Sequence, residues 1–280
     1  MTDHRRCWRL LQSGAADGAW NMAVDEALLE ALVAGVGQPT LRLYAWQPPA
    51  VSLGFFQVLD GGISLTEIAA RGFGLVRRPS GGRAILHQDE VTYSVTVPED
   101  LVPDGQSVMG SYRSISRGIE AGLALLGVGA TLAERRDMPR MKAAGLPTVC
   151  FAKAASCDMT VAGRKIVGSA QTRRRGVIMQ HGSVPISIDP AEHLAVMPGG
   201  GTDASSQRQL REAACGVADA LGRPVSSEEL SVALVQGFAE RLDLELAPGE
   251  LSPWEEAKAQ ELRDGKYATE AWTNTPGRRR

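Results

Sequence analysis

Apolar residues recur at helical spacing in two long segments of the chain. In the first segment, Asp17 and Gly35 are residue types that begin and end helices, and the apolar side chains between them share one face. In the second, which starts at Ser107, apolar residues recur at steps of three and four, so we expect an amphipathic helix there as well. The residues that carry the two patterns are Trp20, Ala23, Val24, Ala27, Leu28 and Ala31, and then Val108, Tyr112, Ile115, Ile119, Leu123 and Leu126.

Shorter β-prone segments predict strands between and after these helices. Residues 148–188 are mostly of this kind, and a tight turn at Ala162-Gly163 separates the segments 158–161 and 165–170. The other predicted strands cover residues 41–46, 51–55, 73–78, 91–97, 177–180 and 183–188. The break between the last two leaves a turn as one interpretation of His181-Gly182.

The chain after a glycine-rich linker at residues 198–202 is predicted to be helical. Capping boxes at Ser206–Gln209 and Ser226–Glu229 mark two helix starts. A third helix starts at residues 252–255, which combine an N-cap, a proline and an acid, and Gly265 is expected to end it. Strands and helices neither alternate regularly nor separate into blocks, so the predicted class is mixed α/β.

Composition and charge restrict the kinds of function that are open to this chain. Of its 280 residues, 44% are hydrophobic and 22% are charged, which is enough to bury a core in one large domain or two small ones. The 30 basic and 32 acidic residues leave a net charge of −2, so general nucleic-acid binding through phosphate neutralisation is excluded. No segment is typical of a transmembrane helix or a signal peptide. We therefore expect a soluble, cytoplasmic protein.

The cysteines and histidines do not have the spacing of a metal site. The four histidines are scattered, and none of the four cysteines forms a CxxC pair with another. So few cysteines in a chain of this length fit a reducing compartment better than a disulfide scaffold. We expect no metal, and we assign Cys7 and Cys215 to packing.

A glycine pair surrounded by arginines is the first candidate for chemistry. Paired glycines let backbone N–H groups converge on a carbonyl or phosphate oxygen, and the arginines would add positive charge. No Gly-Lys-Ser/Thr follows, so the segment is not a Walker loop. A surface turn with solvated arginines is the alternative interpretation. The segment reads Arg77-Arg78-Pro79-Ser80-Gly81-Gly82-Arg83-Ala84.

A lysine at the start of a predicted strand is the second candidate. From this position Lys165 can direct an ammonium group at an acyl oxygen, whereas a hairpin with an exposed lysine is the alternative. His181 is open to the same choice between a site residue and a turn residue. The segment around the lysine reads Gly163-Arg164-Lys165-Ile166-Val167-Gly168-Ser169-Ala170-Gln171.

Cys150 is the third candidate. A nucleophilic cysteine needs partial exposure and a basic neighbour that favours the thiolate, and Lys153 and Lys165 can supply it. Cys157 is the poorer candidate, because the adjacent Asp158 would raise the pKa of its thiol. Since most free cysteines behave as small buried hydrophobes, burial is the alternative for Cys150.

Four linked motifs, in order over nearly the whole chain, resemble those of the lipoate–protein ligase and octanoyltransferase family. The resemblance implies a biotin/lipoate protein ligase-like catalytic domain over residues 1–280, with mixed, mostly antiparallel sheets flanked by helices. Its core would cover about residues 15–250, followed by the C-terminal helix 252–265 and a tail. The motifs are Trp20–Glu26, Arg77–His87 with Thr92-Tyr93-Ser94, Gly163–Gln171 with Gln180–Ser183, and Lys266–Trp272.

Two branches of the family differ just before the lysine. Ligases typically carry Arg-Asn-Asp there, whereas this chain has Ser156-Cys157-Asp158. Cysteine-dependent octanoyltransferases carry Cys-Phe further upstream, and here Cys150-Phe151 stands fifteen residues before Lys165. The chain therefore resembles the branch that modifies the glycine cleavage H protein. Residues 152–155 depart from the Asp-Ala-Pro-Ser that is usual in that branch.

The resemblance implies acyl transfer in two steps without ATP or another cofactor. Cys150 would take an octanoyl group from the phosphopantetheine of acyl carrier protein, and a lysine of the H protein or another lipoyl domain would then accept it. Lys165 would favour the thiolate and stabilise the oxyanion. The substrate-binding residues would be Arg77, Ser80, Gly81, Gly82, Arg83, His87, Gly168, Ser169, Ala170, His181 and Gly182.

Three other functions fit the same motifs. An ATP-dependent lipoate ligase would use Lys165 on the carboxylate or adenylate, an amidotransferase would move octanoyl between lipoyl domains, and a non-catalytic relative would only bind lipoyl domains or the acyl group. We expect a monomer with no nucleic-acid or membrane partner. Basic residues that would dock an acidic carrier protein, or simply form a solvated loop, are Arg135, Arg136, Arg140, Lys142 and Arg173–Arg175.

Overall fold

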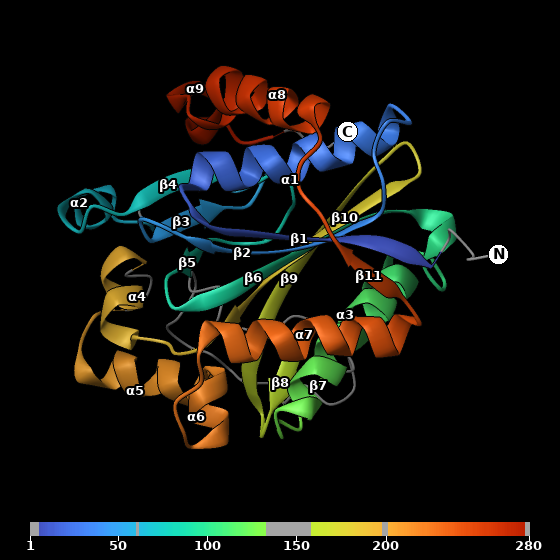
Figure 1. Cartoon of the computed structure of the whole chain (residues 1–280). Coiled ribbons are helices and arrows are strands. Elements are labelled where there is room, and N and C mark those ends of the chain that lie inside the picture. Colours follow the sequence, from blue (N-terminus) through green and yellow to red (C-terminus); the bar gives the residue numbers. More distant parts are fainter. Residues whose placement is uncertain (1–5, 60–61, 133–157, 198–200, 278–280) are drawn as a thin grey trace.

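A mixed sheet of eight strands organises the residues that the computed structural model describes, which are 6–59, 62–132, 158–197 and 201–277 (Figure 1). The strands lie in the order β11-β1-β2-β6-β10-β9-β8-β7. Strands β11, β1 and β2 are parallel, and every later pair is antiparallel. The strands are β1 (Cys7–Ala16), β2 (Thr40–Trp46), β6 (Glu90–Pro98), β7 (Thr131–Leu132), β8 (Met159–Val161), β9 (Arg164–Arg174), β10 (Val177–Pro185) and β11 (Glu245–Pro248).

A smaller sheet carries the arginine–glycine segment. In it, β3 (Ala50–Leu53) pairs in parallel with β4 (Gly74–Arg77) and antiparallel with β5 (Ile85–His87). The predicted class, mixed α/β with mostly antiparallel sheets flanked by helices, is confirmed.

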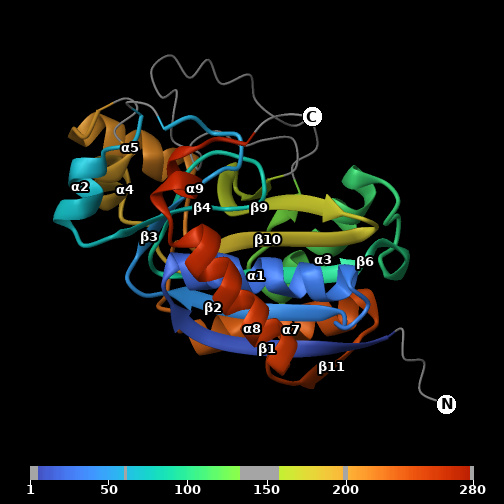
Figure 2. The ribbon, with the colours of Figure 1, turned by 90° about the horizontal axis from the view of Figure 1, so that it is seen from above.

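Helices cover both faces of the large sheet. Helices α1 (Gly18–Val33) and α8 (Pro253–Leu262) lie together on one face, and α3 (Val108–Leu125) and α7 (Ser227–Leu242) on the other (Figures 1 and 2). Among the described residues, no helix has the length and apolar character needed to cross a membrane. The shorter helices are α2 (Leu65–Ala70), α4 (Pro190–Val196), α5 (Ala204–Ala213), α6 (Val217–Leu221) and α9 (Glu270–Asn274), with a 3-10 turn at Glu99–Leu101.

The two long helices predicted from apolar spacing are confirmed. Asp17 caps α1 by accepting a hydrogen bond from the Trp20 amide, and Gly35 follows the helix with a φ of 73°, in the left-handed region where helices often end. In α3, Ile115, Ile119 and Leu123 are fully buried against the sheet. The stripe is shorter than predicted, because its first residue, Val108, is 59% exposed.

Helices α3 and α7 cross at unusually close range. A Cβ atom on Gly237 of α7 would lie 2.1 Å from the backbone nitrogen of Gly122 and 2.6 Å from the carbonyl oxygen of Gly118 on α3. The backbones touch because all three positions lack a side chain. This contact brings Phe238 into the main core, under the sheet residues Tyr93 and Val95.

Strand β10 corrects the prediction of two strands at 177–180 and 183–188. It is continuous over Val177–Pro185, so His181 and Gly182 lie within a strand and not in a turn. Both residues are in register with β6 on one side and β9 on the other. Pairing on two sides outweighs the weak strand preference of a His-Gly pair.

The C-terminal third contains three further differences from the prediction. Strand β11 was not expected there, and its partner, the N-terminal strand β1, was not predicted either. Helix α5 is capped by Asp203, because the Ser206 amide donates to Asp203 and Ser206 is not the cap. The caps at Ser226 and Ser252 are confirmed. Helix α8 ends at Leu262, and a π-helical turn (Arg263–Tyr267) continues through Gly265.

Substituting Gly237→Ala is expected to destabilise the protein by about 1–3 kcal/mol, because the new methyl group would overlap the α3 backbone. This overlap outweighs the roughly 1 kcal/mol that alanine gains over glycine in a helix. Urea unfolding followed by circular dichroism measures the change. The matched control is Gly129→Ala, whose Cβ would meet no atom within 4 Å. Equal stability of the two variants would contradict the close helix crossing.

Candidate active site

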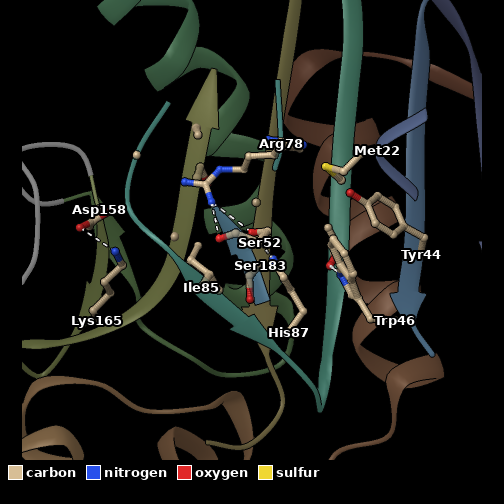
Figure 3. A pocket seen from close by; sticks show the side chains of 17 residues that line it. Met22, Tyr44, Trp46, Ser52, Arg78, Ile85, His87, Asp158, Lys165 and Ser183 are labelled. Atoms are coloured by element: carbon tan, nitrogen blue, oxygen red, sulfur yellow. Dashed lines mark hydrogen bonds and ion pairs between the residues drawn. The ribbon is translucent and has the colours of Figure 1, made fainter. Parts of the chain in front are cut away.

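A pocket lies where the small sheet meets the large sheet on the α1 side. It encloses about 660 Å³ of empty space, and part of that space is open to solvent. Figure 3 shows Met22, Tyr44 and Trp46 together on one side and Asp158 with Lys165 on the other. The pocket therefore has an apolar, aromatic end and a charged end.

The pocket brings together many of the residues predicted from sequence. It is lined by Gly82, His87, Lys165, Gly168, Ser169, Ala170, His181 and Gly182. Four other predicted binding residues, Arg77, Ser80, Gly81 and Arg83, are not among the residues that line it. Cys150, Cys157 and the basic residues Arg135, Arg136, Arg140 and Lys142 lie outside the described residues.

Lys165 forms a buried ion pair at the charged end. Its Nζ lies 2.9 Å from Oδ2 of Asp158, and the two residues are 3% and 5% exposed. The pair spans the β8–β9 hairpin, since Asp158 directly precedes β8 and Lys165 is the second residue of β9. The exposed-hairpin alternative for Lys165 is thereby excluded. A cation kept in such a site has a fixed position toward any group that enters the pocket.

A chain of hydrogen bonds runs through His87 on the pocket wall. Nδ1 of His87 lies 2.8 Å from Oε1 of Glu90, and Nε2 lies 2.8 Å from Oγ of Ser52. The ring stacks on Trp46 at a centroid distance of 4.0 Å and an angle of 11°. Burial favours a raised pKa for Glu90, but His87 and the hydroxyl groups of Ser183 and Thr92 hold the pKa below its ordinary value.

A second chain runs through His181. Its Nδ1 lies 3.0 Å from Oδ2 of Asp25, and its Nε2 lies 2.5 Å from Oγ of Ser80. Asp25 also accepts from Arg42 at 2.7 Å and from the Tyr44 hydroxyl at 3.0 Å. Burial alone would raise the pKa of Asp25, but Arg42 and His181 together lower it. Ser80 thus ties the glycine segment to the floor of the pocket.

Both arginines of the Arg77-Arg78 pair bind backbone carbonyl groups. Arg77 donates to Thr273, Gly54 and Gln57, away from the pocket lining. Arg78 lines the pocket, but its donors are used within the protein, on Gly81, Arg83 and Ser52. The two guanidinium groups therefore shape the loop that covers the pocket.

Gly182 lets a polar network on the opposite face of the sheet reach Ser169. Tyr93 on β6 donates to Oγ of Ser169 on β9 at 2.7 Å, and it passes over Gly182 on the strand between them. A Cβ on Gly182 would lie 2.5 Å from that oxygen and 2.6 Å from the Tyr93 ring. Burial raises the pKa of Tyr93 to about 12, so its hydroxyl stays a donor.

The polar side chains of the wall are bonded to one another, and this decides what the pocket can hold. Trp46 donates to Thr92, and Thr92 and Ser183 both donate to Glu90. A wall whose donors and acceptors are already paired accepts a hydrocarbon chain without leaving polar groups unsatisfied. Among the described residues, no group of three or more His, Cys, Asp or Glu side chains is placed to hold a metal ion.

Several residues of the hydrogen-bond chains around the pocket were missed by the sequence analysis. Asp25 carried a local signal, since an acid stood inside a predicted helix whose neighbours are apolar, and it is fully buried. Ser52 and Arg42 carried none, because their partners His87 and Asp25 are distant in sequence. Glu90 has nearby partners in His87 and Thr92, but nothing in the sequence showed that these side chains meet. For the proposed basic patch, Arg173 pairs with Glu99, and Arg174 with Glu26 and Glu30, so both are already engaged by carboxylates.

Comparison with known proteins gives consistent matches over almost the whole chain. Residues 17–239 match the family described as the lipoyl protein ligase A/B catalytic domain. An octanoyltransferase LipM of Symbiobacterium thermophilum is 47% identical over 268 residues, which are 95% of this chain and 97% of the relative.

Two solved structures share the fold at somewhat lower sequence identity. A lipoate-protein ligase A bound with ATP has a TM-score of 0.79 and 26% identity, over 96% of this chain and 98% of that one. A bi-partite lipoate protein ligase from Thermoplasma acidophilum, studied with its E2 lipoyl domain, has a TM-score of 0.77 and 25% identity, over 98% and 99% of the two chains.

Substituting Asp25→Asn is expected to cost about 3–5 kcal/mol of stability at pH 7, because Arg42 would lose its carboxylate partner in a buried site. The pKa of Asp25 is lower in the folded protein than its ordinary 3.8, so the unfolded chain takes up this proton first. The stabilisation is therefore complete above about pH 4 and is lost as the pH falls below that value.

Urea unfolding at a series of pH values tests this expectation. The stability of the variant should fall less toward acidic pH than the stability of the wild type. The control is Asp243→Asn, which breaks an exposed pair with Arg6 and should cost no more than about 1 kcal/mol. A cost for Asp25→Asn as small as that of the control would show that the buried pair contributes little.

Proposed function

Because the chain belongs to the lipoyl protein ligase A/B catalytic-domain family, we propose that it is an octanoyltransferase of protein lipoylation that works through a Cys150 thioester. The observation that carries the proposal is the pocket itself. A buried Lys165 ammonium stands at one end, and the buried apolar residues Met22, Tyr44 and Trp46 stand at the other. This arrangement fits a molecule with one polar, reactive end and a medium-length hydrocarbon tail.

In the first step, the Cys150 thiolate attacks the thioester carbonyl of octanoyl-acyl carrier protein. The new C–S bond forms, the old one breaks, and the phosphopantetheine thiol leaves. Lys165, held in place by Asp158, stabilises the oxyanion of the tetrahedral intermediate. One thioester replaces another, so the step is nearly neutral in free energy and needs no ATP.

In the second step, a lysine of a lipoyl domain takes the octanoyl group as an amide. The proposed acceptor is the glycine cleavage H protein, and conversion of a thioester to an amide is downhill. The name of the octanoyltransferase relatives supports the octanoyl group, and the lipoyl domain studied with the Thermoplasma ligase supports the class of acceptor. The protein supplies orientation and charge and does not need a cofactor.

The apolar end of the pocket is proposed to select the chain length. Burial contributes about 0.8 kcal/mol per methylene, so an eight-carbon tail gains roughly 5 kcal/mol. Tyr44 and Trp46 are held by hydrogen bonds to Asp25 and Thr92, so this wall keeps its position. Met22 lines the same end of the pocket, and its side chain is flexible.

An ATP-dependent lipoate ligase is the second candidate, and the similarity to the ATP-bound ligase structure favours it. In that reaction Lys165 would contact the carboxylate or the adenylate of the acid. Cys150 would then have no covalent role. An amidotransferase that takes octanoyl from one lipoyl domain to another would keep the thioester and change only the donor.

Incubation with octanoyl-acyl carrier protein without ATP is expected to add one octanoyl group to the wild-type chain, measured by intact-mass spectrometry. Cys150→Ala should gain no mass, because the nucleophile is gone. Cys157→Ala is the matched control and should be acylated like the wild type.

The other outcomes point to the other functions. Modification of a lipoyl domain only with free octanoic or lipoic acid and ATP would establish the ligase. Acylation of Cys150 only from an octanoylated lipoyl domain would establish the amidotransferase. No acylation and no modification under any of these conditions would leave a binding protein and would refute all three catalytic candidates.

Substituting Met22→Ala is expected to shift the preference toward decanoyl over octanoyl donors by about tenfold in kcat/KM, because two more methylenes would be buried. The measurement compares the two donors in competition. Met22→Leu conserves volume and should keep the octanoyl preference. An unchanged chain-length preference in Met22→Ala would place the end of the acyl pocket elsewhere.

A further inference from the structure

The hydrogen bonds around Ser52 and His87 have only one consistent direction. Glu90 is a carboxylate and only accepts, so Nδ1 of His87 carries a hydrogen and donates it across 2.8 Å. In the neutral ring, Nε2 is then an acceptor, and the Ser52 hydroxyl donates to it at 2.8 Å. Arg78 only donates, and its Nη1 lies 3.1 Å from the same hydroxyl oxygen.

The Ser52 hydroxyl keeps one place for a ligand. A hydroxyl oxygen has one hydrogen and two lone pairs, and here the hydrogen goes to His87 and one lone pair accepts from Arg78. Ser52 lines the pocket, and Figure 3 shows it between the Lys165–Asp158 pair and the Met22–Tyr44–Trp46 wall. A hydrogen-bond donor that enters the pocket can therefore bind the second lone pair.

Glu90 is arranged to stabilise a positive charge on His87. Within the described residues, its other hydrogen-bond partners are the neutral hydroxyl groups of Thr92 and Ser183. With His87 neutral, Glu90 is a buried carboxylate, 5% exposed, that has no cation bonded to it within the same residues. A proton transferred to His87 during the reaction turns this contact into an ion pair.

We propose that Ser52, His87 and Glu90 form a proton relay that deprotonates the lysine ammonium of the acceptor domain in the second step. This inference rests on the proposed function, because it needs an enzyme-bound thioester for the amine to attack. Ser52 contacts the incoming amine, and His87 acts through Ser52 as the proton acceptor. Glu90 positions the ring of His87 and fixes its tautomer.

The atoms of the step balance as follows. The ammonium group gives one proton to the Ser52 oxygen while the Ser52 hydrogen passes to Nε2 of His87. The free amine attacks the thioester carbonyl, the C–N bond forms, and Lys165 stabilises the oxyanion. When the intermediate collapses, the C–S bond breaks, and the second proton lost by the nitrogen goes to the leaving sulfur. His87 returns its proton to solvent, so the products are an amide and a thiol.

Lys165 has a different part in this step. Its ammonium is paired with the Asp158 carboxylate at 2.9 Å, so it is the cation that the oxyanion requires. To act as a base, Lys165 would first have to lose its own proton and charge, and the buried Asp158 would then be left without a cation. The two tasks therefore fall to two separate groups in one pocket.

The pH dependence of the relay depends on the charges around His87. These are Glu90 on β6, Arg78 beyond Ser52, and His193 on α4, whose pKa is lowered by burial. The relay needs an Nε2 of His87 that can accept a proton, so lysine transfer should be the half-reaction whose rate depends on pH. Formation of the octanoyl-enzyme should not share this dependence.

The test separates the two half-reactions in the full-length chain. Octanoyl-enzyme formation is followed by intact mass with octanoyl-acyl carrier protein. The isolated octanoyl-enzyme is then mixed at pH 7 either with a lipoyl domain or with hydroxylamine, which arrives as a neutral amine. The variants are His87→Gln and Ser52→Ala. The matched control is Ser94→Ala, which removes a buried hydroxyl on β6 that has no hydrogen-bond partner in the described part of the chain.

Both relay variants are expected to form the octanoyl-enzyme, which shows that they fold, and the lysine transfer is measured on the isolated octanoyl-enzyme so that any change in the first step does not enter it. Transfer to the lipoyl domain should slow by about 10²–10⁴-fold, the usual contribution of a general base. The loss should shrink as the pH rises, discharge by hydroxylamine should be unchanged, and Ser94→Ala should match the wild type in both steps.

Two results would overturn the relay alone. The first is lysine transfer by His87→Gln at the wild-type rate. The second is discharge of the octanoyl-enzyme that slows equally with hydroxylamine and with the lipoyl domain, which would indicate a structural role. Failure of the wild-type chain to form any octanoyl-enzyme would instead refute the proposed function, and the relay with it.

Discussion

Charged groups inside this protein are stable only where each one meets a partner, and this requirement determines the shape of the pocket. Asp25 is fixed by Arg42 and Lys165 by Asp158, and Glu90 is held by hydrogen bonds from His87 and from two hydroxyl groups. Taking an isolated charge out of water costs several kcal/mol, so each pair constrains the positions of both its elements. The pairs join α1 to β2, β8 to β9, and β5 to β6, and the pocket is the space that these elements enclose.

The same requirement connects the C-terminal segment to the pocket loop. Glu26, buried beside Asp25 on α1, binds Lys266 and Tyr267 of the π-helical turn. Farther along, the Trp272 indole donates to the carbonyl of Arg77, whose own side chain returns hydrogen bonds to this segment. The last described helix thus holds the start of the arginine–glycine loop. Arg77 is needed for the site through this contact, although it does not line the pocket.

What could be predicted from the sequence depended on how local the cause was. The starts of α1 and α8 follow from the N-caps Asp17 and Ser252, which act within one helical turn. The strand through His181 was missed, because its two partner strands and not its own residues make it a strand. Lys165 and His87, which the motif resemblance assigned to one site, both line the pocket. The resemblance did not identify Glu90, whose role is visible only from the groups bonded to it. Cys150, on which the proposed chemistry depends, lies outside the described residues.

Two histidines in this pocket have the same connectivity, a serine on Nε2 and a carboxylate on Nδ1, and their surroundings separate their roles. Asp25 already has the Arg42 guanidinium as a counter-ion, so a proton on His181 would add a second positive charge to a pair that is neutral. Glu90 has only hydroxyl groups besides His87 within the described residues, so a proton there completes an ion pair. Ser80 lies outside the pocket lining, whereas Ser52 is part of it. The charge balance and the access both favour His87 as the group that exchanges a proton with a substrate, and His181 as the group that anchors the loop.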